Sequence, residues 1–266
     1  MAIALLLAIL LVILACVYLF IAHPVWFPAG VSAHAAGVDH QFAVAFWLLG
    51  ALFVAGHIAL GISLMRARRR GKVTYTQGDW RLEALWTVLI AVLFFGFNVA
   101  GVRLWSQMKF QQPESDAVQV EVTGTQFEWY FRYAGADGKL GDTDAQRFAH
   151  PEEGNPLGID PDDPAGKDDM VSTSLVLPVG RDVDLTLRSN DVIHSLFIPA
   201  MRFKQDAVPG MSIHAHFRPM QTGEYEISCA ELCGTGHYRM RASVKVVSEA
   251  EFKQWVKSKE LPSTAK

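Results

Sequence analysis

Three long apolar runs occupy the first part of the chain, and short alternating segments occupy the rest. The apolar runs cover residues 3–22, 42–65 and 84–105. About 20 apolar residues are enough for a helix to cross the hydrocarbon layer of a bilayer. The pattern therefore predicts a transmembrane region over residues 1–106 with three helices.

The first apolar run also resembles a secretory signal, because it begins at the N-terminus. No positively charged segment precedes it, and it is longer than the apolar part of a typical signal. These features favour an uncleaved first helix.

A basic loop sets the expected orientation of these helices. Arg66, Arg68, Arg69, Arg70 and Lys72 separate the second and third runs, whereas the 23–41 loop has no Lys or Arg. Lys and Arg accumulate in cytoplasmic loops, so the basic loop is expected inside and everything after residue 107 outside.

The remainder, residues 107–266, reads as an all-β domain. Alternation of apolar and polar residues predicts strands near 117–122, 172–177, 182–187 and 241–246, and turn residues separate them. Many short strands predict a sandwich or a barrel. A Gly-, Pro- and Asp-rich insertion interrupts the pattern at about 137–169. A capping box at Ser248 predicts a short last helix at about 249–258.

Charge is divided unevenly between the two parts. Residues 1–106 carry 7 basic and 3 acidic residues, and residues 107–266 carry 17 basic and 24 acidic residues. An acidic exterior domain favours a basic partner through electrostatic steering. No basic stripe or matching motif points to nucleic acid.

Candidate metal ligands gather near the C-terminus. The segment reads Cys229-Ala-Glu231-Leu-Cys233-Gly-Thr-Gly-His237-Tyr-Arg-Met240, and His194 stands upstream at the end of a strand-like run. Sulfur and imidazole ligands select copper, zinc or iron–sulfur chemistry. Two cysteines four residues apart suit two copper ions that share both sulfurs.

The other ligands complete this binuclear interpretation. His194 and His237 would each bind one copper, and Met240 is a weak axial ligand. The Glu231 carbonyl would complete the second copper. Alternatives are a Cys229–Cys233 disulfide and a zinc ion held by two cysteines and two histidines, which would leave the methionine without a role.

In these motifs the chain resembles subunit II of the haem–copper cytochrome c oxidases, and its exterior part resembles the cupredoxins. The ligand segment carries the resemblance, together with Asp191-Val-Ile-His194-Ser and Lys204-Gln-Asp206-Ala-Val-Pro-Gly210. The resemblance implies a binuclear CuA centre that accepts electrons from cytochrome c. Electrons would pass to haem in subunit I of a proton-pumping oxidase, with this domain in the periplasm and the helices in the bacterial inner membrane.

The resemblance implies further roles. Glu231 would offer its carboxylate to a Mg²⁺ ion shared with subunit I, Asp191 is a candidate interface carboxylate, and Glu83 would lie at the mouth of a proton channel. Phe127 replaces the tryptophan that takes the electron from cytochrome c in the family, so Trp129 is expected to contribute.

Two other functions share these features. One is the copper-bearing subunit of a nitric oxide reductase in the same superfamily. The other is a membrane-anchored copper carrier, which requires an accessible site from which copper can exchange.

Overall fold

The computed structural model describes residues 2–22, 28–71, 75, 77–135, 137–147 and 154–259. Within these residues the chain forms two compact units. The first contains Met1–Pro28 and Gly37–Leu104, and the second contains Ala29–Ala36 and Trp105–Lys266. Residues 29–34, which directly precede the second helix, thus belong to the β domain.

The first unit is helical. Its elements are α1 (Ala2–Ala22), α2 (Ala35–Arg70) and α3 (Trp80–Lys109). By length and hydropathy, α2 and α3 can each span a membrane. The apolar part of α1, Ile3–Leu19, is shorter than these two helices. Apolar side chains such as Leu49 and Phe95 are exposed all round these helices, as expected for helices that face lipid.

Glycines bring the helices of this unit together. A Cβ atom at Gly61 of α2 would lie 3.0 Å from Leu6 of α1, and one at Gly37 would lie 3.0 Å from Leu104 of α3. The start of α3 is capped by Asp79, whose carboxylate accepts a 2.9 Å hydrogen bond from the Arg81 amide.

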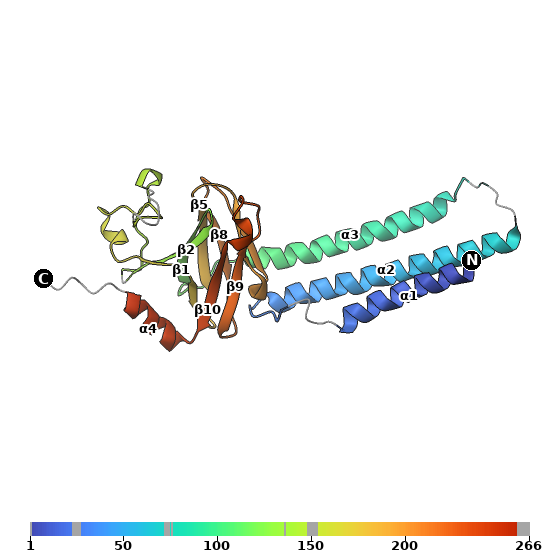
Figure 1. Cartoon of the computed structure of the whole chain (residues 1–266), viewed down its shortest axis with the longest axis horizontal. Helices are drawn as coiled ribbons and strands as arrows, with labels where there is room; N and C mark the ends of the chain where they lie inside the picture. The colour runs from blue at the N-terminus through green and yellow to red at the C-terminus, as the bar shows by residue number, and fades with distance from the viewer. Residues whose placement is uncertain are drawn as a thin grey trace. The chain divides into compact units, whose positions relative to one another are not determined.

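The second unit is a sandwich of two five-stranded sheets around one core (Figure 1). The first sheet has the order β3-β2-β1-β5-β8 and the second β4-β10-β9-β6-β7. The strands are β1 (Val118–Thr125), β2 (Glu128–Tyr133), β3 (Met170–Ser172), β4 (Leu175–Pro178), β5 (Val183–Ser189), β6 (His194–Ile198), β7 (Phe203–Ala207), β8 (Ile213–Phe217), β9 (Gly223–Cys229) and β10 (Arg241–Val247). A last helix, α4 (Glu249–Lys259), packs beside β4.

The alternation in the sequence is the cause of this arrangement. Val183, Leu185 and Leu187 of β5 are fully buried, and the residues between them are only partly buried. The expected helix cap is also present, because the Ser248 amide donates to the Glu251 carboxylate at 2.9 Å. The two-sheet domain expected from the sequence is therefore confirmed.

The 172–177 segment differs from its expected single strand. It is divided by a turn in which the Ser174 amide donates to the Ser172 hydroxyl at 3.1 Å. Residues before the turn form β3 in one sheet, and residues after it form β4 in the other. Alternation alone does not reveal such a change of sheet, because both halves keep the same period.

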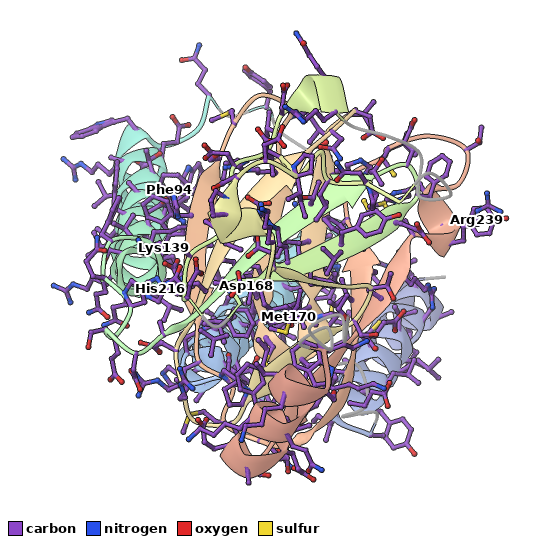
Figure 2. The ribbon with its side chains drawn as sticks, turned by 90° about the vertical axis from the view of Figure 1, so that its left-hand side faces the viewer. Phe94, Lys139, Asp168, Met170, His216 and Arg239 are labelled. Atoms are coloured by element: carbon purple, nitrogen blue, oxygen red, sulfur yellow. The ribbon has the colours of Figure 1, made fainter. Side chains whose placement is uncertain are left out.

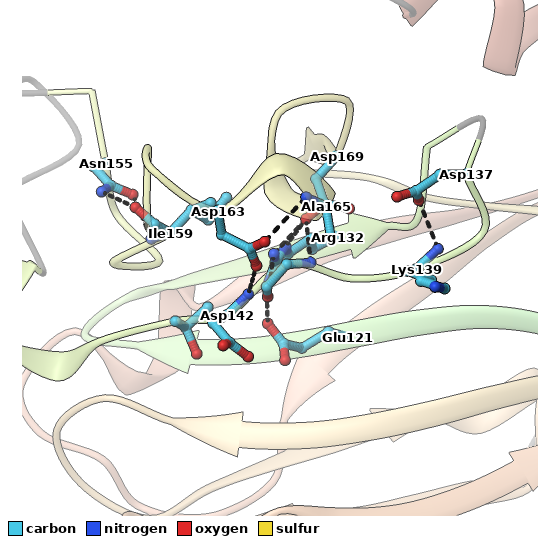
Figure 3. A network of polar contacts seen from close by, with 12 residues as sticks. Glu121, Arg132, Asp137, Lys139, Asp142, Asn155, Ile159, Asp163, Ala165 and Asp169 are labelled. Atoms are coloured by element: carbon cyan, nitrogen blue, oxygen red, sulfur yellow. Dashed lines mark hydrogen bonds and ion pairs between the residues drawn. The ribbon is translucent and has the colours of Figure 1, made fainter.

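A buried arginine fixes the acidic insertion to the sandwich (Figure 3). The Arg132 side chain is 1% exposed, lies 3.3 Å from the Glu121 carboxylate, and forms an ion pair with Asp169. It also donates to the Gly141 carbonyl at 2.6 Å. The two ends of the insertion therefore meet at one charged group on the outer face of the first sheet.

A second ion pair links the start of the domain to β5 and β8. Arg218 donates to Asp182 at 2.7 Å, and the Glu114 amide donates to the same carboxylate at 3.0 Å. The Arg218 hydrogen bond holds the pKa of Asp182 below its usual range, although burial opposes this shift. The ionised carboxylate therefore stabilises the fold.

We expect Asp182→Asn to lower the free energy of unfolding by about 1.5–3 kcal/mol at pH 7, because it removes a hydrogen-bonded charge. The pKa of Asp182 is lower in the folded chain than in the unfolded chain, so the stabilisation is complete above the unfolded pKa of about 3.9. It decreases as the pH falls below that value and is lost once the pH has fallen through the lower, folded pKa. Denaturant titrations at pH 7 and pH 3 measure both values. Asp116→Asn, at a carboxylate 66% exposed, should change little; an equal loss in both variants would contradict the prediction.

Candidate metal centre

Two cysteine sulfurs form the middle of the candidate site. Cys229 is the last residue of β9, and Cys233 lies in the loop that follows. Both are buried, and their Sγ atoms are 3.9 Å apart. A disulfide bond is about 2.0 Å long, so the two cysteines are free, and the disulfide alternative does not apply to this structure.

A histidine lies beside each sulfur. The Nδ1 atom of His194 is 3.8 Å from the Cys229 sulfur, and Nδ1 of His237 is 3.5 Å from the Cys233 sulfur. His194 is fully buried. It is the first residue of β6 and not the end of a strand as expected, because the chain turns at 190–193 before re-entering the sheet.

Two weaker ligands flank the same sulfurs. The Met240 sulfur lies 3.8 Å from that of Cys233, and the Glu231 carbonyl oxygen lies 3.2 Å from that of Cys229. The Glu231 carboxylate is 3.4 Å from the Lys204 ammonium group. One residue thus contacts the sulfur pair through its backbone and a surface cation through its side chain.

The spacing of the nitrogen ligands favours two metal ions over one. A single tetrahedral ion would hold all four Cys and His ligand atoms within about 4 Å of one another. Among the described residues, the ligand atoms of His194, Cys229 and Cys233 lie within 4.8 Å of one another, and His237 falls outside this group. The histidines therefore lie at opposite ends of the sulfur pair, an arrangement that a single zinc ion does not fit.

The surroundings of Cys233 favour its neutral thiol over its thiolate. Burial, followed by the neighbouring Cys229, raises the pKa of Cys233 to about 11. The thiolate is the form that binds metal. A metal ion must therefore displace the Cys233 proton at neutral pH, which couples metal binding to proton release.

Asp191 holds His194 in place. Its carboxylate lies 2.7 Å from Nε2 of His194 and accepts a 2.6 Å hydrogen bond from the Gln126 amide. Partial burial raises the pKa of Asp191, but the hydrogen bonds from His194 and the backbone outweigh it and keep the pKa low. With Nε2 engaged, Nδ1 is the nitrogen that faces the sulfurs, as expected for a metal-binding histidine.

Two aromatic residues contact the site from different sides. The Trp129 ring meets the His194 ring edge to face, with centroids 5.9 Å apart, and Trp129 is 1% exposed. Phe127 is partly buried against the loop that carries Cys233. The Arg239 guanidinium lies 5.9 Å above the Phe127 ring, and the Arg239 side chain points outward from the domain (Figure 2).

Gly236 has no space for a side chain. A Cβ atom there would overlap the Phe127 ring, so we expect Gly236→Ala to displace the metal loop and to destabilise the protein by about 1–3 kcal/mol. Thermal unfolding of Gly236→Ala and of Thr235→Ala, an exposed position in the same loop, measures the effect. Adding Phe127→Ala should restore part of the loss; no recovery would show that the overlap is not the cause.

Sequence reasoning missed the role of Gln126. Its side-chain amide donates to the Cys233 carbonyl, and its backbone amide donates to Asp191. Gln126 therefore connects the loop of one cysteine to the aspartate that holds His194. Its position directly before Phe127, which stands where the family has a tryptophan, was the available signal.

Glu83 lies apart from these ligands in the chain, in the first turn of α3. A Cβ atom at Gly78 would lie 2.6 Å from its carboxylate oxygen, so the side chain folds back over the start of the helix. Glu83 belongs to the first unit, and the sulfur-centred site belongs to the second.

Comparison with known proteins supplies the family. Residues 118–247 match the family model for the periplasmic domain of cytochrome c oxidase subunit II. The chain is 35% identical to the alternative cytochrome c oxidase subunit 2 of Bradyrhizobium diazoefficiens, over 87% of this chain and 83% of that protein. It is 30% identical to cytochrome c oxidase subunit 2 of Thermostichus vulcanus, over 90% and 80% of the two chains.

Among solved structures, the periplasmic domain of cytochrome oxidase subunit II of Bradyrhizobium japonicum is 28% identical with a TM-score of 0.40, over 56% of this chain and 95% of that one. The β domain is cupredoxin-like, as the sequence resemblance implied. On its sequence identity to these relatives over most of its length, the chain belongs to the cytochrome c oxidase subunit II family, whose members are parts of an oxidoreductase complex.

Proposed function

We propose that this chain is the electron-accepting subunit of a proton-pumping terminal oxidase. It would take electrons from cytochrome c and deliver them to haem in subunit I, where oxygen is reduced to water. The observation that carries this proposal is the pair of unbonded sulfurs 3.9 Å apart with one histidine beside each.

The proposed cofactor is a binuclear copper centre, CuA. Its ligands would be His194, Cys229, the Glu231 carbonyl, Cys233, His237 and Met240. When bound, such a centre supplies one-electron chemistry with little change in bond length, because both coppers share the charge. The donor set suits it, since thiolate, imidazole and thioether are the ligands that copper prefers.

The burial of the ligands supports electron transfer over copper delivery. Cys229 is 8% exposed, Cys233 3%, and His194 and Met240 0%. A copper carrier needs ligands that a partner can reach and exchange. Here the sandwich encloses them, and Asp191 and Gln126 fix the surrounding loops.

Phe127 and Trp129 are the proposed contacts on the donor side. The Trp129 ring touches His194 directly, but the residue is buried. Phe127 packs on the metal loop and lies under the exposed Arg239. We propose that an electron arrives over the Phe127 edge of the domain, with Trp129 as the aromatic group beside the ligand.

The acidic insertion is proposed to steer a basic donor such as cytochrome c. Both ends are anchored by Arg132, and between them the Pro156 carbonyl accepts a 3.3 Å hydrogen bond from Asn190. Asn190 directly precedes Asp191, so the insertion lies beside the segment that holds His194. Its negative charge is therefore close enough to raise the rate at which a cationic partner meets the site.

Two further roles concern subunit I. We propose that the Glu231 carboxylate binds a Mg²⁺ ion shared with that subunit, because its side chain is 45% exposed and carboxylate oxygen is a ligand that Mg²⁺ prefers; the ion would displace Lys204, which lies 3.4 Å from this carboxylate. Glu83 is proposed to collect protons at the cytoplasmic start of α3. With other oxidase subunits and lipid, the helices would sit in the bacterial inner membrane and the β domain in the periplasm.

Electron paramagnetic resonance of the purified full chain loaded with copper tests the proposal. One unpaired electron shared equally by two copper nuclei gives a seven-line mixed-valence spectrum. A four-line spectrum would mean a single copper ion, and a chain that binds no copper would exclude electron transfer at this site. Either result would contradict the proposed function.

A further inference from the structure

An apolar groove follows the seam between α1 and α2. Three hollows lie along this seam, with volumes of about 790, 220 and 340 Å³, and the third shares no lining residue with the first two. The first two share Ile13 of α1 and Phe53 of α2 in their linings. The helices run antiparallel here, because early residues of α1 pair with late residues of α2.

The third hollow ends in positive charge. Ile3 and Leu6 of α1 line it together with Met65, Arg68 and Arg69 of α2. Within the part of the chain that the structure describes, no ion pair to either guanidinium is found. An apolar slot therefore opens beside two arginines that pair with no carboxylate among the described residues.

We propose that this groove binds an anionic phospholipid, with its phosphate at Arg68 and Arg69 and an acyl chain along the seam. The arginines belong to the loop expected on the cytoplasmic side, where the leaflet is rich in anionic lipid. Guanidinium groups bind phosphate through paired hydrogen bonds. The site therefore complements both parts of the lipid.

The dimensions agree with one lipid of one leaflet. At 1.5 Å per residue, Arg68 and Ala55 are about 20 Å apart along α2. Half of a bilayer, headgroups included, is also about 20 Å thick. An acyl chain whose headgroup lies at Arg68 would thus end near Ala55, which lines the largest of the three hollows.

The closeness of the two helices argues against a partner helix as the occupant of the seam. A Cβ atom at Gly61 would already touch Leu6, so α1 and α2 are in contact between the hollows. A helix needs about 10–12 Å of width with its side chains. The seam has room for a flexible acyl chain but not for a helix inserted between α1 and α2.

Native mass spectrometry of the full chain in detergent, with phosphatidylglycerol or phosphatidylcholine added, tests the charge requirement. The unaltered chain should retain one phosphatidylglycerol in preference to phosphatidylcholine. Arg68→Gln with Arg69→Gln should weaken phosphatidylglycerol binding about 30-fold, at about 1 kcal/mol per arginine. Arg66→Gln with Arg70→Gln removes the same charge outside the hollow and should change it little. Equal losses in the two pairs would overturn the proposal.

A second pair of variants tests the groove itself. Ala55 lines it, whereas Gly56 does not, and a Cβ atom at Gly56 meets nothing within 4 Å. Ala55→Phe should reduce retention of both lipids at least tenfold, and Gly56→Phe should leave it unchanged. If the chain with both Arg68→Gln and Arg69→Gln does not accumulate in membranes, the comparison of Ala55→Phe with Gly56→Phe tests the lipid site by itself. Unchanged phospholipid binding by the Ala55→Phe chain would refute the lipid site. Unchanged phospholipid binding by a chain whose intact mass shows that α1 is missing would refute it as well.

Discussion

Replacing Cys229 with serine is expected to abolish the proposed binuclear copper centre. The hydroxyl is a poor copper ligand at neutral pH, and a single remaining sulfur would leave no shared ligand pair. Loss of a supporting group already costs about 10–100-fold in metal affinity, so loss of a bridging ligand should cost more than about 100-fold. Copper content should fall from two ions per chain to at most one, and electron uptake from reduced cytochrome c should fall with it.

Cys16→Ser is the matched control. Cys16 is the third cysteine of the chain and is exposed on α1, away from the ligands in the sequence. It should keep both copper ions and the mixed-valence spectrum. Cys233→Ser should behave like Cys229→Ser. A Cys229→Ser chain that still shows a seven-line spectrum would mean that the sulfurs do not bridge.

Arg132→Met is expected to lower the free energy of unfolding by about 3–5 kcal/mol. The change leaves the Asp169 side chain, 0% exposed, without the Arg132 cation, whereas the Glu121 carboxylate keeps Arg188 at 3.2 Å. We expect the ends of the acidic insertion to separate from the sheet. Denaturant titration measures the stability, and limited proteolysis between residues 137 and 169 measures the release of the insertion.

Arg147→Met tests whether burial is the reason. Arg147 pairs with Asp160 at 3.3 Å in the same insertion, but its side chain is 40% exposed. Exposed pairs contribute about 0–1 kcal/mol, so this variant should unfold at nearly the unaltered denaturant concentration. Similar losses for both arginines would show that charge number, and not burial, determines the stability of the insertion.

Much of the fold follows from local patterns. Apolar runs identified the helices, and the alternation of Val183, Leu185 and Leu187 identified β5, because these periods directly report which face is buried. The closeness of four of the candidate ligands was predictable for a similar reason. Cys229, Cys233, His237 and Met240 lie on one short segment, so their spacing alone limits the distances between them.

Long-range packing explains what the sequence did not reveal. Arg132 lies in a strand where an arginine normally faces water, and it is buried because a distant segment carrying Asp169 covers it. The contacts of Gln126 with Cys233 and of Phe127 with Gly236 also join positions about 100 residues apart. No local period records such contacts.

The β domain also includes residues 29–36, which the ribosome synthesises long before the rest of the domain. Val31 is buried in the core, its amide donates to the Ala200 carbonyl, and its carbonyl accepts from the Met220 amide. Ribosomes add about 5–20 residues per second, so Val31 waits roughly 10–40 s for Met220 to be synthesised. By then α2 has already been made. Completion of the domain is therefore a late event in biosynthesis, and the loop that carries Cys229 and Cys233 is synthesised later still, after Met220.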